Sequence, residues 1–133
     1  MSGESNLAKL LRDMNPVLGE GVFVFCTLAA DEGIPADITP QLTFREPEGL
    51  TVVLRREEAE RAGFRYQFVC RLIILTVHSS LEAIGFLAAV TARLAKAGIS
   101  VNAVSAFHHD HLFVPEHRAD EAVVLLRDMS AQT

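Results

Sequence analysis

The stretch from Cys70 to Pro115 constrains the fold more than any other part of the sequence. Its first run, Leu72–Val77, is aliphatic and rich in branched residues, which predicts a strand covered on both faces. From Leu81 to Ala95 the apolar residues recur at three- and four-residue spacing, the period of an amphipathic helix. Gly98 then suits the left-handed residue just past a helix end. The stretch therefore predicts a buried strand followed by a crossover helix.

Apolar periodicity predicts short helices and strands elsewhere. We expect helices over 4–13, 56–62 and 119–129, hairpins over 17–28 and 42–54, strands over 99–107 and 110–115, and a loop over 29–41. A strand, a crossover helix and two further strands form the handed unit of a ferredoxin-like layer. We therefore expect an α+β fold of the βαββαβ type, with antiparallel sheets and with helices packed on one face.

Each half of this predicted fold is one strand short. The C-terminal half gives the order β-α-β-β-α, and the N-terminal half begins with a helix. An incomplete sheet leaves unpaired backbone groups at its edge, and these need a cover. Either the two halves complete each other's sheets or a second chain completes them.

Composition restricts the possible partners and the compartment. The chain of 133 residues has a net charge of -5 and no basic cluster, which argues against a nucleic-acid partner. No apolar run approaches the ~20 residues that span a bilayer, and the N-terminus lacks the apolar core of a signal peptide. We expect a cytoplasmic protein without a membrane partner, in which Cys26 and Cys70 are buried free thiols.

The corner between the buried strand and the helix is the first candidate site. Ser79 and Glu82 have the spacing of a capping box, in which both side chains satisfy the helix end. A helix N-terminus also attracts carboxylates, and Gly85 would let a ligand approach the backbone closely. From the residues alone, capping and ligand binding both remain open.

The same stretch resembles the core of an ACT domain, a small ligand-sensing module. Two positions depart from the usual pattern, because Ile84 stands where proline is common and Glu82 replaces an aspartate. The residues that match in order are Glu82, Gly85, Phe86, Leu87, Ala88, Thr91, Leu94, Ala95, Ala97, Gly98 and Ile99. The whole chain is similar to short bacterial proteins with two ACT-like halves, which resemble the ACT-built arginine sensors of eukaryotes. The resemblance implies halves at residues 1–67 and 68–133.

The resemblance also implies a function and a set of site residues. ACT domains bind small molecules at this corner, against the start of the next strand of a neighbouring domain. It implies a regulatory or sensor protein that binds an amino acid between ACT domains, most simply as a homodimer, with no catalysis and no cofactor. The implied ligand-binding residues are Ser80, Leu81, Glu82 and Gly85 on one wall, with Ser100 and Asn102 on the other. We add Ser79, which lies at the same corner, to this set.

A polar cluster, His108, His109, Asp110 and His111, is the second candidate site. Alternation along a strand puts at most two of these side chains on one face, and no C-x-x-C motif supplies further ligands, so we expect no metal. The resemblance places this turn near the ligand cleft, where Asp110 could pair with an amino or guanidinium group and the histidines could confer pH sensitivity. A solvated turn is the alternative.

Other functional classes remain as alternatives. One is a ligand-free dimerisation or docking module, and another is a metal-binding or hydrolytic protein that uses the histidine cluster. The sequence has no nucleophile elbow, P-loop or G-x-G-x-x-G motif, so we expect no enzyme.

Overall fold

The computed structural model describes residues 3–133 and contains two compact units. The first unit, called the terminal unit, comprises the described chain up to Glu20 together with Arg71–Thr133. The second, called the central unit, comprises Gly21–Cys70. The predicted division into two ACT-like halves, residues 1–67 and 68–133, is a different division from these compact units. It stays a prediction.

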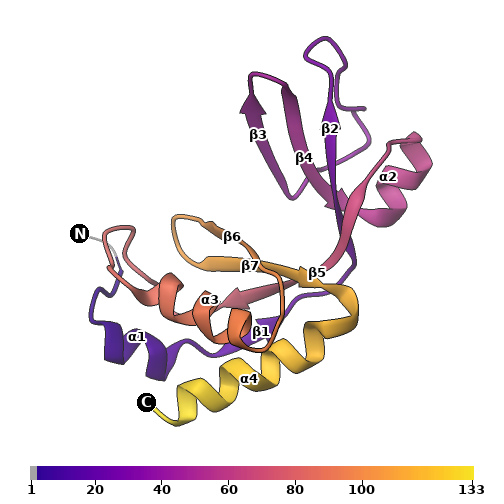
Figure 1. Cartoon of the computed structure of the whole chain (residues 1–133). Coiled ribbons are helices and arrows are strands. Elements are labelled where there is room, and N and C mark those ends of the chain that lie inside the picture. Colours follow the sequence, from indigo (N-terminus) through magenta and orange to yellow (C-terminus); the bar gives the residue numbers. More distant parts are fainter. Residues whose placement is uncertain (1–2) are drawn as a thin grey trace. The chain divides into compact units, whose positions relative to one another are not determined.

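The terminal unit is an antiparallel sheet with helices packed against it (Figure 1). The strands lie in the order β1-β5-β7-β6. The elements are α1 (Leu7–Asp13), β1 (Pro16–Leu18), the second part of β5 (Gln67–Leu75), α3 (Phe86–Lys96), β6 (Asn102–Ser105), β7 (Asp110–Pro115), a 3-10 turn (Glu116–Arg118) and α4 (Ala119–Ala131).

Strand β1 supplies the fourth strand of this sheet. It pairs antiparallel with β5, from Pro16 opposite Leu75 to Leu18 opposite Ile73. Beyond β1, the N–H of Gly19 still donates to the carbonyl of Leu72 at 2.8 Å, so the chain follows β5 and does not turn back on itself. The expected hairpin over residues 17–28 is therefore wrong, and the missing strand comes from within the chain.

One hydrophobic core joins the three helices to this sheet. The helices contribute apolar stripes at helical spacing, and β5 and β7 contribute alternate residues. Its buried members include Leu10, Met14, Ile73, Leu75, Phe86, Val90, Leu94, Leu112, Val114, Ala122, Val123 and Leu126. Burying one such leucine or phenylalanine stabilises the fold by about 1.5–3 kcal/mol. The shared core holds the start of α3 against the hairpin of β6 and β7, where the candidate site lies.

The central unit has the strand order β3-β4-β2-β5 and one helix. Its core residues include Val24, Cys26, Leu28, Ile38, Val52, Leu54 and Ala59. The elements are β2 (Phe23–Leu28), β3 (Leu42–Glu46), β4 (Gly49–Arg55), α2 (Arg56–Ala62) and the first part of β5 (Gln67–Leu75). The predicted hairpin over 42–54 is confirmed, and α2 ends at the left-handed Gly63, as expected.

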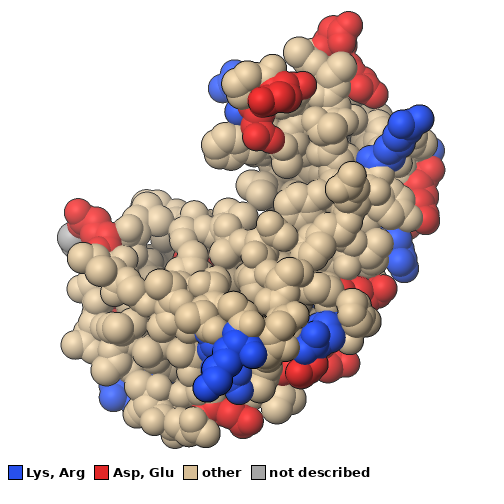
Figure 2. All heavy atoms as spheres, viewed as in Figure 1, with Lys and Arg blue, Asp and Glu red and all other residues tan. Residues whose placement is uncertain are grey.

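The structure confirms the predicted α+β class, with antiparallel strands and packed helices. It also confirms that Cys26 and Cys70 are buried free thiols. Figure 2 shows acidic and basic side chains in small mixed groups over the visible face. In the described part of the chain, no helix has both the length and the apolar character needed to cross a membrane.

Candidate functional site

The corner after β5 is a hydrogen-bonded loop. An isolated bridge joins Glu4 to Ser79, in which the N–H of Glu4 donates to His78 and the N–H of Ser80 donates to Glu4, both at 2.8 Å. The N–H of Glu82 donates to the Ser80 hydroxyl at 3.1 Å. Gly3 packs so closely that an added Cβ would lie 2.7 Å from the Ser80 nitrogen. The amide groups of Ser80, Glu82 and Ala83 in the corner therefore all have partners within the chain.

Helix α3 begins after this loop, at Phe86. The chain enters it through Gly85, whose φ of 89° is readily adopted only by glycine. The capping box, one of the two alternatives for Ser79 and Glu82, is not formed, because the helix starts four residues beyond Glu82. Leu81 and Ile84, which fit the helical period in the sequence, are instead 63% and 86% exposed.

The N-terminus of α3 has no side-chain cap and no acidic residue in its first turn. The first N–H groups of a helix have no partner inside the helix, and they carry a partial positive charge. Phe86 and Leu87, at the start of α3, both line a cavity in the terminal unit. The cavity is therefore positively polarised on this side.

This cavity brings together three segments that are distant in the sequence. They are the corner loop, the start of α3 and the turn between β6 and β7. Its volume is about 60 Å³, well below the roughly 300–1,000 Å³ of pockets that enclose a drug-sized ligand. Its lining residues are Ser79, Ser80, Leu81, Ala83, Phe86, Leu87, Ser105, Ala106 and Asp110.

Asp110 lies on the opposite wall and is only 6% exposed. Its Oδ1 accepts a hydrogen bond from the Ser105 hydroxyl at 2.6 Å. Between residues 3 and 133, no cationic side chain forms an ion pair with it. Because a buried carboxylate is costly without a compensating partner, the cavity is suited to a cation on this side. The alternative interpretation of this segment, a solvated turn, is wrong for Asp110 because its side chain is buried.

Four predicted site residues thus meet in one cavity, namely Ser79, Ser80, Leu81 and Asp110. The other four do not line it. Glu82, Ser100 and Asn102 are exposed, and Gly85 precedes the helix that forms one wall. Sequence reasoning missed Ser105.

The register of the hairpin could have identified Ser105. It lies directly opposite Asp110 where β6 pairs with β7. In the predicted hairpin, a polar residue that lies opposite Asp110 is a candidate hydrogen-bond partner for its carboxylate, and Ser105 is that residue.

The histidine cluster surrounds the turn next to Asp110. The His78 and His108 rings are 5.2 Å apart between centroids, and those of His109 and His111 are 6.5 Å apart. Burial lowers the pKa of His111, and the neighbouring His109 lowers it further. The described residues include no group of three or more His, Cys, Asp or Glu side chains that could hold a metal ion.

Comparison with known families agrees with this architecture over almost the whole chain. Residues 2–71 match one ACT domain family, and residues 67–128 match a second ACT domain family. The chain belongs to the ACT domain family. It contains two ACT domains in tandem, in accordance with the resemblance seen in the sequence of the corner and of α3.

Two solved bacterial proteins are similar to this chain in structure over most of its length. A protein of unknown function from Vibrio cholerae, described as a possible transport protein, is 43% identical, with 93% of this chain and 95% of that chain covered and a TM-score of 0.82. A protein from Agrobacterium tumefaciens is 21% identical, with 86% and 87% covered and a TM-score of 0.73. None of the curated proteins compared matches the chain significantly.

The same fold occurs in regulatory parts of enzymes. The regulatory subunit of aspartate kinase from Thermus flavus is 9% identical, with 86% of this chain and 96% of that chain covered and a TM-score of 0.65. At this identity the likeness concerns the fold alone. The tandem ACT domains of this chain therefore share their fold with that subunit.

Proposed function

We propose that this protein is a regulatory sensor that binds an amino acid at the cavity between Asp110 and the start of α3. One observation carries the proposal, namely that a buried carboxylate and an uncapped helix N-terminus line the same cavity. An α-amino acid has an ammonium and a carboxylate on one carbon. The ammonium pairs with Asp110, and the carboxylate accepts from the first amides of α3.

The cavity is too small for a whole amino acid. At about 60 Å³ it accepts the charged end of the ligand and leaves the side chain outside, beside the exposed Leu81. A second copy of the chain would enclose the rest. The opposite wall would then come from the second copy. Its exposed Ser100 precedes the edge strand β6, and its exposed Asn102 is the first residue of that strand. This arrangement is the homodimer with ligand held between ACT domains.

Binding between two copies makes the ligand a regulator of assembly. A ligand that binds the paired form shifts the population toward that form, and it stabilises the folded chain as well. At a ligand concentration one hundred times the dissociation constant, the stabilisation is about 2.7 kcal/mol. The protein needs no catalysis of its own for this role.

A thermal-shift screen across the twenty amino acids tests the proposal. We expect one amino acid, or a few related ones, to raise the melting temperature of the full chain. Asp110→Asn keeps the shape of the side chain and removes its charge, so this variant should lose the response. Asp128→Asn changes an exposed acid on α4 and should keep it. An unchanged response in Asp110→Asn, with the fold verified by circular dichroism, would refute the assignment.

A ligand-free docking module is the second candidate. It is favoured by the exposed apolar side chains Leu81, Ile84 and Phe107. Sedimentation equilibrium separates the two functions. A sensor dimerises more tightly when the active amino acid is added, whereas a docking module responds to none of the twenty.

A further inference from the structure

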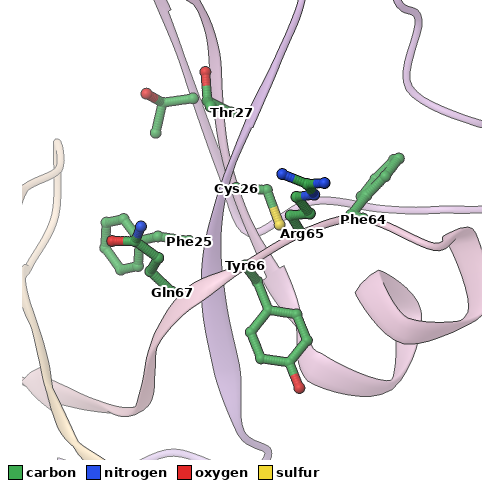
Figure 3. A pocket seen from close by; sticks show the side chains of 8 residues that line it. Phe25, Cys26, Thr27, Phe64, Arg65, Tyr66 and Gln67 are labelled. Atoms are coloured by element: carbon green, nitrogen blue, oxygen red, sulfur yellow. The ribbon is translucent and has the colours of Figure 1, made fainter.

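A larger cavity, about 850 Å³ in volume, lies within the central unit (Figure 3). Three consecutive residues of β2, namely Phe25, Cys26 and Thr27, line it. Thr51 of β4 and the segment 64–67 before and into β5 complete the lining. Nothing in the corner around Asp110 contributes to it, so the two cavities are separate.

The lining shows where this cavity lies relative to the sheet. Consecutive residues of a strand point to opposite faces. Cys26 belongs to the core face, and Phe25 and Thr27 belong to the other face. Figure 3 shows Phe25 and Gln67 on one side of β2, with the Cys26 sulfur, Phe64 and Arg65 on the other. The cavity therefore borders both faces beside the edge of β2 that faces β5, and at Thr51 it extends over the face that carries Phe25 and Thr27.

The backbone of β2 is open along this edge. The N–H of Arg56 donates to Val22, so the even-numbered residues of β2 bond toward β4 and the odd-numbered ones point toward β5. Strand β5 pairs with β2 only at Phe23 and Phe25. In the part of the chain that the structure describes, the N–H and C=O of Thr27 thus point past the end of the β2–β5 ladder, toward the cavity.

The side chains around this edge have a definite chemistry. Arg65 is the one charged residue among those lining the cavity, it is exposed, and it forms no ion pair with any residue from 3 to 133. Phe25 on one face and Phe64 on the other provide apolar walls. An occupant therefore gains from main-chain hydrogen bonds, an acidic group on the Arg65 side and apolar groups.

We propose that this open edge of β2 binds an extended acidic peptide segment of a partner protein by strand addition. The segment pairs with Thr27 through its backbone, as peptides do at other exposed sheet edges. Its alternate side chains reach the two faces, where an aspartate or glutamate meets Arg65 and an aliphatic or aromatic residue meets Phe25. The proposal is independent of amino-acid binding at Asp110, because it uses another unit of the chain.

A panel of acetylated and amidated pentapeptides tests this docking site on the full chain. The peptides alternate aspartate or glutamate with valine, leucine or phenylalanine. We expect at least one to bind and to slow hydrogen exchange of the Thr27 amide, measured by NMR. Methylating the peptide nitrogens one at a time should weaken binding about tenfold at every second position and little between, because a strand bonds its neighbour through alternate residues.

Two variants separate charge recognition from general effects. Arg65→Glu should weaken the acidic peptides at least about tenfold and should favour a peptide that alternates valine with lysine. Arg45→Glu changes an exposed arginine on β3 that does not line the cavity, and it should leave binding unchanged. Failure of the whole panel to protect Thr27, or a methylation scan without alternation, would overturn the proposal. So would concentration-dependent protection of Thr27 in the free protein, which would mean that a second copy occupies the edge.

Discussion

The Ser105 hydroxyl donates to the Asp110 carboxylate across 2.6 Å, where β6 and β7 lie opposite each other beside their turn. This bond holds a buried charge in place at the wall of the candidate cavity. Ser105→Ala should therefore lower the free energy of unfolding by about 1.5 kcal/mol, the usual range for a hydrogen bond to a charged group. Urea unfolding measures the change. Ser100→Ala, at an exposed serine of the same region, should change it by less than about 0.5 kcal/mol. Equal effects in the two variants would contradict this role of the bond.

Phe86 fixes the start of α3 to the core of the terminal unit. Its side chain is only 2% exposed, and it packs in the cluster that joins the helices to the sheet. Phe86→Ala should lower the free energy of unfolding by about 3–5 kcal/mol, because the large cavity left behind cannot collapse fully. Phe44→Ala removes a side chain that is 65% exposed and serves as the matched control. A small effect at Phe86 in urea unfolding would show that this packing is not as described.

Gly98 ends α3 in the left-handed region, with φ of 75°. No atom lies within 4 Å of an added Cβ there, so the cost of Gly98→Ala comes from backbone strain alone. We expect a loss of about 1–2 kcal/mol in the free energy of unfolding. Gly33→Ala also meets no neighbour and is not in that region, so it should be neutral or slightly stabilising. Equal melting temperatures for the two variants would refute the strain.

Cys70 makes stability depend on pH on the alkaline side. Burial raises the pKa of its thiol from 9.0 to about 12. Below pH 9.0 the thiol is protonated in both states and its contribution is complete. Above it, the unfolded chain releases the proton while the folded chain retains it, so the free energy of unfolding falls as the pH rises toward about 12.

The Cys70→Ala variant isolates this contribution. Its free energy of unfolding, measured in urea at several pH values above 9.0, should fall less steeply than that of the unchanged chain. Burial also raises the pKa of Cys26, so some alkaline slope should persist. An identical slope in Cys70→Ala would exclude Cys70 as its source.

Sequence reasoning succeeded where local signals define an element. The bounds of α2 follow from a charged helical run closed by Gly63, and the bounds of β7 follow from an apolar run that ends at Pro115. The hairpin of β3 and β4 has its turn between Glu46 and Gly49, as expected. These features need no knowledge of distant segments.

The errors arose where the structure of a segment depends on contacts with parts of the chain that are distant in the sequence. Val17 and Leu18 predict a strand, and only the three-dimensional structure shows that its partner is β5. Leu81 and Ile84 continue the helical period of α3, yet Gly85 separates them from the helix. The observed start of α3, at Phe86, therefore lies beyond Ser79 and Glu82, where the sequence predicts the helix to begin. The candidate site kept Ser79, Ser80, Leu81 and Asp110, and it gained Ser105 from a register that periodicity does not reveal.

The pairing of β1 with β5 also sets an order of events during synthesis. Residues 21–66 separate β1 from β5 in the chain, so a ribosome adds most of the central unit after β1 and before the part of β5 that pairs with it. Chains grow at about 5–20 residues per second. The backbone groups of β1 that pair with β5 therefore lack their partner for some seconds. The terminal sheet is thus the last to close, and a chaperone that shields the nascent N-terminal segment would act in that interval.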